Sequence, residues 1–227
     1  MKICVIIPVH NEMREIGDIV ESLKKKELDV VVVDDGSMDQ SGKISEEKGA
    51  FVIRNEKKSG KGLSLQKGFS YAIDNDYSGV ITVDGDGQHD TEDIDQFLRE
   101  AEKDPCRVIT GTRMGAPQGM PFVRYTTNRF MSWLISCICK QKIPDSQCGF
   151  RYIHCEILKQ IQFVSSDFEI ESEVLIKASK RGYRISSVPI KTIYRNEKSK
   201  ISPIKDTLKF FTYLIKETFG SNLHKSP

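Results

Sequence analysis

Three carboxylates, an amide and an imidazole fall within the stretch VDGDGQHD at residues 83–90. Asp84, Asp86 and Gln88 alternate along it, so in an extended backbone their side chains project to one side. Like charges this close repel one another, and oxygen donors in this arrangement suit a hard divalent cation such as Mg²⁺ or Mn²⁺. A bound cation would neutralise the repulsion, and the intervening glycines would let a ligand approach closely. The stretch therefore predicts a divalent-cation site.

Other interpretations of the acidic stretch fit the residues less well. A solvated acidic turn is common, but it does not explain why the acids directly follow an apolar run. An EF-hand requires Gly at the sixth loop position and Glu at the twelfth. Counted from Asp84, those positions hold His89 and Asp95. A zinc site is disfavoured because His89 has no Cys or His partner nearby in the sequence.

The sequence lacks two common phosphate-binding loops. SGKG at residues 59–62 resembles part of a P-loop, but Asn55 and Gly62 stand where that loop requires a glycine and a hydroxyl residue. PVHNE follows the first apolar run, in place of the GxGxxG of dinucleotide-binding folds. A nucleoside diphosphate would therefore have to bind through the cation itself.

Short apolar segments alternate with helical patterns through the first half of the chain. The segments, each of the length of one buried strand, are residues 3–9, 30–33, 50–53, 80–83 and 107–110. This alternation predicts an α/β fold with a mostly parallel sheet covered on both faces. Ligands bind such sheets beyond the carboxyl ends of the strands. Polar clusters follow three of the segments, at 10–12, 34–37 and 84–90, so acidic side chains are expected to converge on one edge.

The second half of the chain is less regular. It predicts a helix over 130–138, a helix that ends near Gly182 and a strand over 183–190. Ser202 and Pro203 then begin an amphipathic helix that runs to Phe219. We therefore expect an α/β domain over 1–200 and a C-terminal amphipathic helix and tail over 201–227. That helix either packs on the domain or lies on a membrane surface.

Composition is that of an ordinary soluble protein. The 227 residues carry a net charge of +2, so bulk charge gives no reason to expect a nucleic-acid partner. Basic residues gather between 177 and 209, either as a solvated face or as a surface for phosphates or anionic lipid. No apolar run approaches the roughly 20 residues of a membrane span. Six cysteines without a CxxC pair, and no signal peptide, predict reduced thiols in a cytoplasmic protein.

Several motifs together resemble one family. IIPVHNE, VVDDGSMD, SGKGLSLQKG and VDGDGQHD occur in the order seen in glycosyltransferase family 2, which has the GT-A fold. The later motifs TGTRM, DSQCGFRYI, VPIKTIYR and KSK resemble its dolichol-phosphate or polyprenyl-phosphate mannosyl- and glucosyltransferase branch. The resemblance spans roughly residues 3–200. It implies metal-dependent, inverting transfer of a hexose from a GDP- or UDP-sugar to a dolichyl or undecaprenyl phosphate, at the cytoplasmic face of a membrane.

The resemblance also implies roles for individual residues. Pro8, Glu12, Asp35 and Asp84 would bind the donor nucleotide, and Asp84, Asp86 and Gln88 would bind Mg²⁺ or Mn²⁺. Asp86, Arg113 and Lys200 would act in catalysis. Arg124, Arg129, Arg151 and Ser199 would bind the acceptor phosphate. Gln147 and Cys148 depart from the family, which usually has Thr and Ser before GFR.

The acceptor decides what further chemistry is needed. A hydroxyl acceptor needs a general base, and Glu169 or Glu171 could serve, although acids at a helix start are more often structural. A lipid phosphate is already anionic, since its second pKa is about 6, and it needs positive charge instead. Two alternatives are therefore a family 2 enzyme with a hydroxyl acceptor and a non-catalytic module that binds nucleotide sugars. A nucleotidyltransferase is disfavoured because PVHNE lacks a glycine-rich loop. Phe130 and Trp133 are expected in the core, with membrane contact as the alternative.

Overall fold

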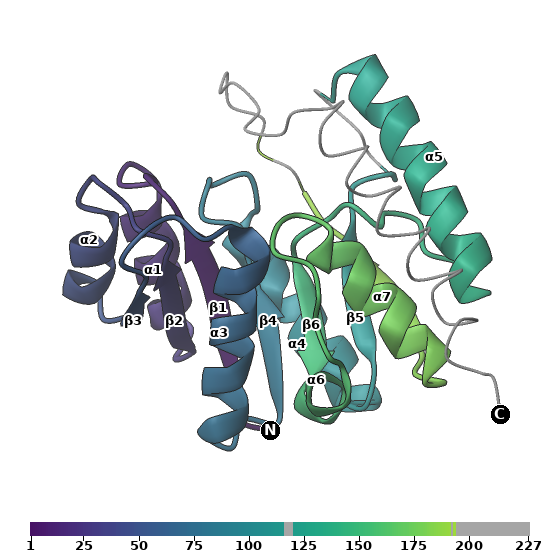
Figure 1. The fold of residues 1–227 in the computed structure, drawn as a ribbon, viewed down its shortest axis with the longest axis horizontal. Helices are drawn as coiled ribbons and strands as arrows, with labels where there is room; N and C mark the ends of the chain where they lie inside the picture. Colours follow the sequence, from purple (N-terminus) through teal and green to yellow (C-terminus); the bar gives the residue numbers. More distant parts are fainter. Residues whose placement is uncertain (116–119, 192, 194–227) are drawn as a thin grey trace, which may run out of the picture.

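A seven-stranded sheet forms the centre of the computed structural model, which describes residues 1–115, 120–191 and 193 (Figure 1). The strand order is β3-β2-β1-β4-β6-β5-β7. Only β6 runs antiparallel to its neighbours; the other strand pairs are parallel. The strands are β1 (Ile3–Val9), β2 (Asp29–Asp34), β3 (Phe51–Arg54), β4 (Gly79–Thr82), β5 (Val108–Thr112), β6 (Arg151–His154) and β7 (Ile185–Pro189). The prediction of a mostly parallel sheet is thereby confirmed.

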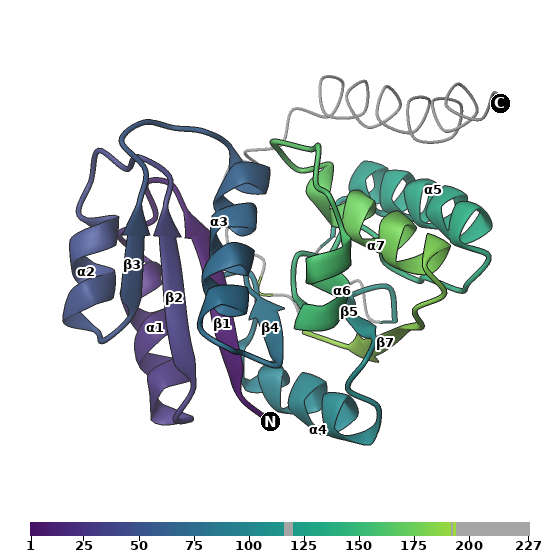
Figure 2. The same ribbon diagram turned by 60° about the horizontal axis from the view of Figure 1, so that its bottom comes forward.

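Helices cover both faces of the sheet. The helices are α1 (Ile16–Lys25), α2 (Ser41–Glu47), α3 (Lys61–Asp74), α4 (Ile94–Lys103), α5 (Phe122–Cys139), α6 (Cys155–Gln160) and α7 (Ile170–Lys180). Apolar side chains of α3, α5, α6 and α7 share one core cluster, and those of α1 and α4 share the other. Figures 1 and 2 show α3, α6 and α7 on one side of the sheet, with α1 and α4 on the opposite side.

The two core clusters explain why the first strand reads as one apolar run. Successive side chains of a strand point to opposite faces. Cys4 and Ile6 therefore pack into the cluster beneath α3, whereas Val5 and Ile7 pack into the cluster beneath α1. All four are fully buried. A strand with core on both sides must be apolar at every position, which is the pattern that the sequence shows.

The structure departs from the sequence prediction in the second half. Helix α5 begins at Phe122, eight residues before the predicted start, and the antiparallel β6 was not predicted. Strand β6 is short, and its ends, Arg151 and His154, are polar, so it carries no apolar run to reveal it. The predicted helix from Pro203 lies outside the described residues, and the division at residue 200 stays a prediction. None of the described helices combines the length and apolar character needed to cross a bilayer.

Arg151 has a structural role in the sheet. Its side chain is 2% exposed. Its guanidinium donates to the carbonyls of Cys148 at 2.7 Å, Ser146 at 2.7 Å and Glu171. These bonds hold the turn before β6 against the start of α7. An enclosed group with three backbone partners does not face an acceptor, so these contacts do not support the phosphate-binding role that the resemblance implied for Arg151.

Replacing Arg151 by Met is expected to destabilise the fold strongly. The change leaves three buried carbonyls without donors, which costs about 3–5 kcal/mol by analogy with broken buried polar networks. For a chain of this length that corresponds to a fall in Tm of roughly 10 °C. The matched control is Arg124→Met on the partly exposed face of α5, which should change stability by less than about 0.5 kcal/mol. An unchanged Tm with weaker acceptor binding would instead restore a ligand-binding role for Arg151.

Candidate active site

The acidic stretch lies at the carboxyl end of β4, where the sequence placed it. Asp84 is the most strongly compensated carboxylate there: its Oδ1 lies 2.5 Å from the Lys61 ammonium, and its Oδ2 lies 3.3 Å from Nε2 of His89. Burial alone would raise the pKa of Asp84, but the Lys61 charge and the His89 hydrogen bond outweigh it and hold the pKa well below its ordinary value. Asp84 is therefore a carboxylate near neutral pH.

Asp86 is in the opposite situation. Its Oδ1 accepts a hydrogen bond of 3.0 Å from the backbone N–H of Gln88. Burial, and then the nearby negative charge of Asp84, raise the pKa of Asp86. In the part of the chain that the structure describes, no lysine or arginine forms an ion pair with Asp86. Asp86 is thus the carboxylate of this site that would gain most from an added cation.

The donor set fits a hard divalent cation with open positions. Among the described residues, no three His, Cys, Asp or Glu side chains gather closely enough to hold a metal by themselves. Two carboxylates and the Gln88 amide leave coordination positions for other oxygens. Mg²⁺ is commonly bound in this way, through one or two carboxylates together with substrate phosphates. The site therefore fits a cation that binds jointly with a diphosphate.

Lys61 connects the acidic stretch to helix α7. Its ammonium lies 2.6 Å from Oε1 of Glu171, at the start of α7, and 2.5 Å from Asp84. Although burial would lower the pKa of Lys61, the two carboxylates raise it above its usual value, so the side chain stays charged. Glu171 is engaged as an ion-pair partner, which corresponds to its structural interpretation rather than to a general base.

Gly149 lies directly against the carboxylate of Asp84. A Cβ at residue 149 would lie 2.6 Å from Oδ2 of Asp84 and 2.7 Å from its Oδ1, so the carboxylate occupies the space that a side chain would need. The carbonyl of Gly149 also accepts a 2.6 Å hydrogen bond from Oγ1 of Thr82, on β4. Because β6 is antiparallel, the segment that precedes it lies at the same edge as the ends of the parallel strands. The CGFR motif therefore lies against the acidic stretch.

Asp35 organises the loop on the other side of the site. Its carboxylate accepts hydrogen bonds from Asn55 Nδ2 at 2.8 Å and from the backbone N–H groups of Ser59 at 2.8 Å and Gly60 at 2.9 Å. Burial would raise the pKa of Asp35, but these hydrogen bonds lower it overall. The predicted nucleoside residue Asp35 is thus ionised and fixes the loop that leads into α3.

The turns after β1 and β2 are tied together beside this loop. Asn11 donates its backbone N–H to Oγ of Ser37 at 3.0 Å, and the Glu12 N–H donates to Oγ of Ser41 at 2.8 Å. Asn11 has a φ of 58°, a conformation that Asn tolerates better than most residues. Pro8 and Lys61 line a cavity of about 10 Å³. A cavity of this volume has room for one water molecule only. This cavity is too small to hold a nucleotide.

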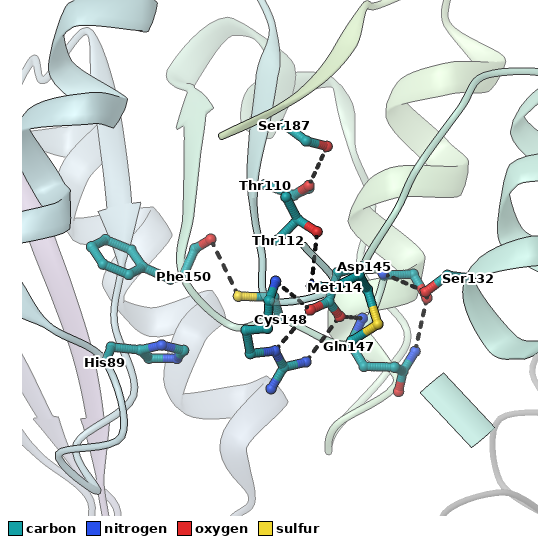
Figure 3. Close-up of polar contacts among 12 residues, drawn as sticks. His89, Thr110, Thr112, Met114, Ser132, Asp145, Gln147, Cys148, Phe150 and Ser187 are labelled. Carbon is teal, nitrogen blue, oxygen red and sulfur yellow. Dashed lines mark hydrogen bonds and ion pairs between the residues drawn. The ribbon is translucent and has the colours of Figure 1, made fainter. Parts of the chain in front are cut away.

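Arg113 is engaged in a buried ion pair. Its Nε and Nη2 donate to Asp145 at 2.7 Å and 2.9 Å, and its backbone N–H donates to the same carboxylate at 3.2 Å. Burial would raise the pKa of Asp145, but Arg113 lowers it. Figure 3 shows Asp145 beside Gln147 and Ser132, between the end of β5 and helix α5. The structure thus gives Arg113 a positioning contact, and its predicted approach to phosphates stays a prediction.

The two residues that depart from the family motif lie in this cluster. Gln147 donates from Nε2 to Oγ of Ser146 at 3.1 Å and remains partly exposed. Cys148 is fully buried, and burial raises the pKa of its thiol to about 12, so it is a neutral packing group. All six cysteines are free, with Cys106 and Cys137 exposed.

The predicted acceptor residues separate into three groups. Arg124 is partly exposed and Arg129 is exposed, both on α5. Nη1 of Arg129 donates to the hydroxyl of Tyr125 at 3.1 Å. Arg151 is the enclosed structural residue described above. Ser199 lies outside the described residues, and so does Lys200, which was predicted to act in catalysis.

Sequence reasoning missed the roles of three residues. Lys61 stands in the SGKG segment and in a family motif but was given no role, and its partner Glu171 is 110 residues away. Asp145 and Gly149 belong to a recognised motif, but their contacts with Arg113 and Asp84 depend on the antiparallel strand. The one available signal was the glycine on each side of Lys61. Those glycines allow residues 165–167 to lie against the start of α3, where a Cβ on Gly60 or Gly62 would meet them within 2.5–2.7 Å.

Comparisons with known proteins agree with the geometry. The family model described as glycosyl transferase family 2 matches residues 4–162. The uncharacterized protein MJ0544 of Methanocaldococcus jannaschii is 33% identical, with 94% of this chain and 98% of that protein covered. The UDP-N-acetylglucosamine–dolichyl-phosphate N-acetylglucosaminyltransferase of Methanococcus voltae is 30% identical, with 85% of this chain and 86% of that protein covered.

A solved structure has the same fold. Glucosyl-3-phosphoglycerate synthase of Mycobacterium tuberculosis, in complex with Mn²⁺, UDP and glucosyl-3-phosphoglycerate, superposes with a TM-score of 0.72 at 17% identity. The match covers 95% of this chain and 79% of that chain. The predicted glycosyltransferase fold is thereby confirmed.

Replacing Lys61 by Met is expected to destabilise the protein by about 3–5 kcal/mol, because two carboxylates then face each other without a cation. The folded-state pKa of Asp84 would rise because the Lys61 charge that lowers it is gone, so the folded state would keep a proton at pH values where the unfolded state has lost it. The variant should therefore lose stability as the pH rises from 5 to 8, whereas the Lys61–carboxylate contribution in the parent stays constant over that range. Thermal unfolding at several pH values measures this. The exposed Lys58→Met is the control, and a parent-like pH profile in Lys61→Met would contradict the account.

Replacing Gly149 by Ala is expected to displace the Asp84 carboxylate. The added methyl group must move oxygens that lie 2.6–2.7 Å away. We expect Mn²⁺ to bind about tenfold more weakly in the presence of UDP, as when a contact that orients a metal ligand is lost. Electron paramagnetic resonance of free Mn²⁺ measures the affinity. Gly115→Ala is the control, because a Cβ there meets nothing within 4 Å. Equal affinities for the two variants would show that Gly149 does not position Asp84.

Proposed function

The chain belongs to glycosyltransferase family 2, and we propose that it transfers a hexose from a nucleotide sugar to a polyprenyl phosphate, with Mg²⁺ or Mn²⁺ at Asp84, Asp86 and Gln88. The observation that carries the proposal is the contrast between two neighbouring carboxylates. Asp84 has its charge compensated by Lys61, whereas Asp86 has a raised pKa and lies beside it. A cation shared with a diphosphate would supply the missing positive charge.

The family relationship supports the choice of donor and acceptor. The relative from Methanococcus voltae is named for UDP-N-acetylglucosamine and dolichyl phosphate. Transferring both classes of substrate to this chain is part of the proposal. The sugar of that relative differs from the mannose or glucose that the sequence motifs implied. The donor panel for any assay therefore includes UDP-N-acetylglucosamine together with UDP-glucose and GDP-mannose.

Different residues of this chain have separate roles in the proposed reaction. Asp84, Asp86 and Gln88 would hold the cation, which when bound would supply positive charge for the diphosphate leaving group as the C1–O bond breaks. Lys61 keeps Asp84 ionised and in place, and Asp35 holds the loop against which the nucleoside would lie. A phosphate oxygen of the acceptor attacks C1 from the opposite side and inverts it. This oxygen is already anionic, so the reaction needs no general base.

The contacts of Glu171 argue against this residue as the general base that a hydroxyl acceptor would need. A hydroxyl acceptor needs a base, and Glu171 was one of two candidates. In the structure its carboxylate is paired with Lys61 at 2.6 Å. This contact engages the Glu171 carboxylate with the Lys61 ammonium, which matches a structural role for Glu171. Arg124 and Arg129, by contrast, are accessible cations on one helix, which suits recognition of a phosphate.

Replacing Arg124 and Arg129 together by Ala is expected to raise the KM for a short-chain polyprenyl phosphate at least about tenfold, because charge-assisted hydrogen bonds to the phosphate are lost. UDP and Mn²⁺ should still bind as in the parent. The assay uses purified protein, Mn²⁺, the labelled donor panel and detergent-solubilised acceptor, with glycolipid as the product. Lys140→Ala, an exposed cation one residue beyond the helix, is the control. Unchanged transfer by the double variant would favour a hydroxyl acceptor, and binding of donor without any transfer would favour a non-catalytic module.

A further inference from the structure

Helix α5 has two faces of opposite character. Its buried residues are Asn128, Met131, Ser132, Ile135 and Cys139. They lie on the side that packs on the domain, where α5 runs alongside α7 (Figure 1). The other side of the helix faces away from the sheet. One face of α5 is therefore buried in the fold, whereas none of the described residues covers the other.

The outward face is apolar and aromatic. Phe122 is 78% exposed, Val123 74%, Phe130 52% and Trp133 60%. Their spacing puts them on one side of the helix. Phe130 and Trp133 are in ring contact, with centroids 5.9 Å apart. The expectation that Phe130 and Trp133 lie in the core is therefore wrong.

This cluster is unusual for the surface of this protein. The described residues include eleven exposed large apolar side chains, and four of them belong to this one helix. The others are scattered over loops, the strand β3 and the start of α3, as is normal for soluble proteins. An exposed apolar patch, by contrast, is typical of a surface that binds a protein, a membrane or a ligand.

The charge distribution of α5 favours an anionic binding partner. Its 18 residues contain no Asp or Glu. Arg124 and Arg129 lie on it, and the exposed Lys140 and Lys142 follow it. Arg129 lies over the ring of Tyr125, 5.6 Å from its centroid. A helix with aromatic side chains on one face, basic residues at its flanks and no acids is typical of a segment that lies in the headgroup layer of an anionic membrane.

A second copy of the chain fits this face less well. A two-fold interface would place the same patch of both copies together. The arginines of the two helices would then face one another without an acid on α5 to pair with. An anionic lipid surface supplies the opposite charge for every one of them.

We propose that the outward face of α5 docks on an anionic phospholipid bilayer, with Phe122, Phe130 and Trp133 in the headgroup layer. The significance of this docking rests on the proposed function, because a polyprenyl phosphate is anchored in the bilayer by its chain and carries its phosphate in the same headgroup layer. Docking would bring Arg129 to the depth at which the acceptor phosphate emerges. The docking itself requires no acceptor lipid and is tested without it.

Trp133 is the only tryptophan of the chain, so its fluorescence reports on α5 directly. The full-length protein is mixed with vesicles of phosphatidylglycerol, or of phosphatidylcholine as the neutral control, and neither contains polyprenyl phosphate. With phosphatidylglycerol, the emission should shift to shorter wavelength, quenching by acrylamide should fall, and lipids brominated near the headgroup should quench the emission. The shift should be much weaker with phosphatidylcholine.

Two double variants decide whether the patch is responsible. Phe122→Ser with Phe130→Ser keeps the Trp133 reporter and should weaken partitioning onto phosphatidylglycerol vesicles at least about tenfold. Met38→Ser with Val164→Ser is the matched control, since these side chains are 91% and 72% exposed elsewhere on the surface. The control should partition as the parent does. Both variants should keep the parent Tm and the parent affinity for UDP with Mn²⁺.

Three results would overturn the proposal. One is unchanged Trp133 emission with phosphatidylglycerol, and another is equal partitioning of the two double variants. The third is a Trp133 that is shielded from acrylamide without vesicles, which would show that another part of the chain or a second copy covers the patch; sedimentation separates those two cases. Transfer to a detergent-solubilised acceptor is measured separately. If the parent protein transfers sugar but does not bind phosphatidylglycerol vesicles, only this inference is contradicted. If it binds the vesicles but transfers no sugar, only the proposed function is contradicted.

Discussion

The compensation of negative charge at the end of β4 is the constraint on which the site depends. Asp84 and Asp86 lie partly buried at the edge of the sheet, where a carboxylate without a partner is costly. Lys61 compensates the negative charge of Asp84. Because Lys61 also pairs with Glu171, it links the acidic stretch to α7. No ammonium or guanidinium of the described residues pairs with Asp86, and its pKa is raised. The site is thus balanced for one carboxylate and needs a further cation for the other.

The antiparallel strand β6 connects this charge arrangement to the rest of the domain. It enters the sheet between β4 and β5 and brings Gly149 beneath Asp84 and Arg151 against the start of α7. The segment before it also carries Asp145, which holds Arg113 at the end of β5. The half of the sheet that would bind the donor is therefore joined, through one short strand, to the helices that carry the candidate acceptor residues.

Local patterns in the sequence were sufficient for the parallel part of the fold. The strand at residues 3–9 is apolar throughout because both of its faces are buried, and the acids after residues 9, 33 and 83 converge because parallel strands end at one edge. Contacts over long sequence distances could not be predicted in this way. Lys61 and Glu171 pair across 110 residues. Arg151 and Arg129 are both arginines in motif-rich segments, yet only the packing shows that the first is enclosed and the second is exposed. The outward position of Trp133 likewise depends on where α7 covers α5.

The central claim is that a divalent cation is bound by Asp84, Asp86 and Gln88 together with the diphosphate of a nucleotide. Anomalous diffraction from a crystal of the full chain grown with Mn²⁺ and UDP measures this most directly. We expect one manganese peak in contact with the Asp86 carboxylate and the UDP phosphates, with Lys61 still bound to Glu171. Bound UDP with its phosphates away from Asp86, or a manganese peak at other side chains only, would contradict it.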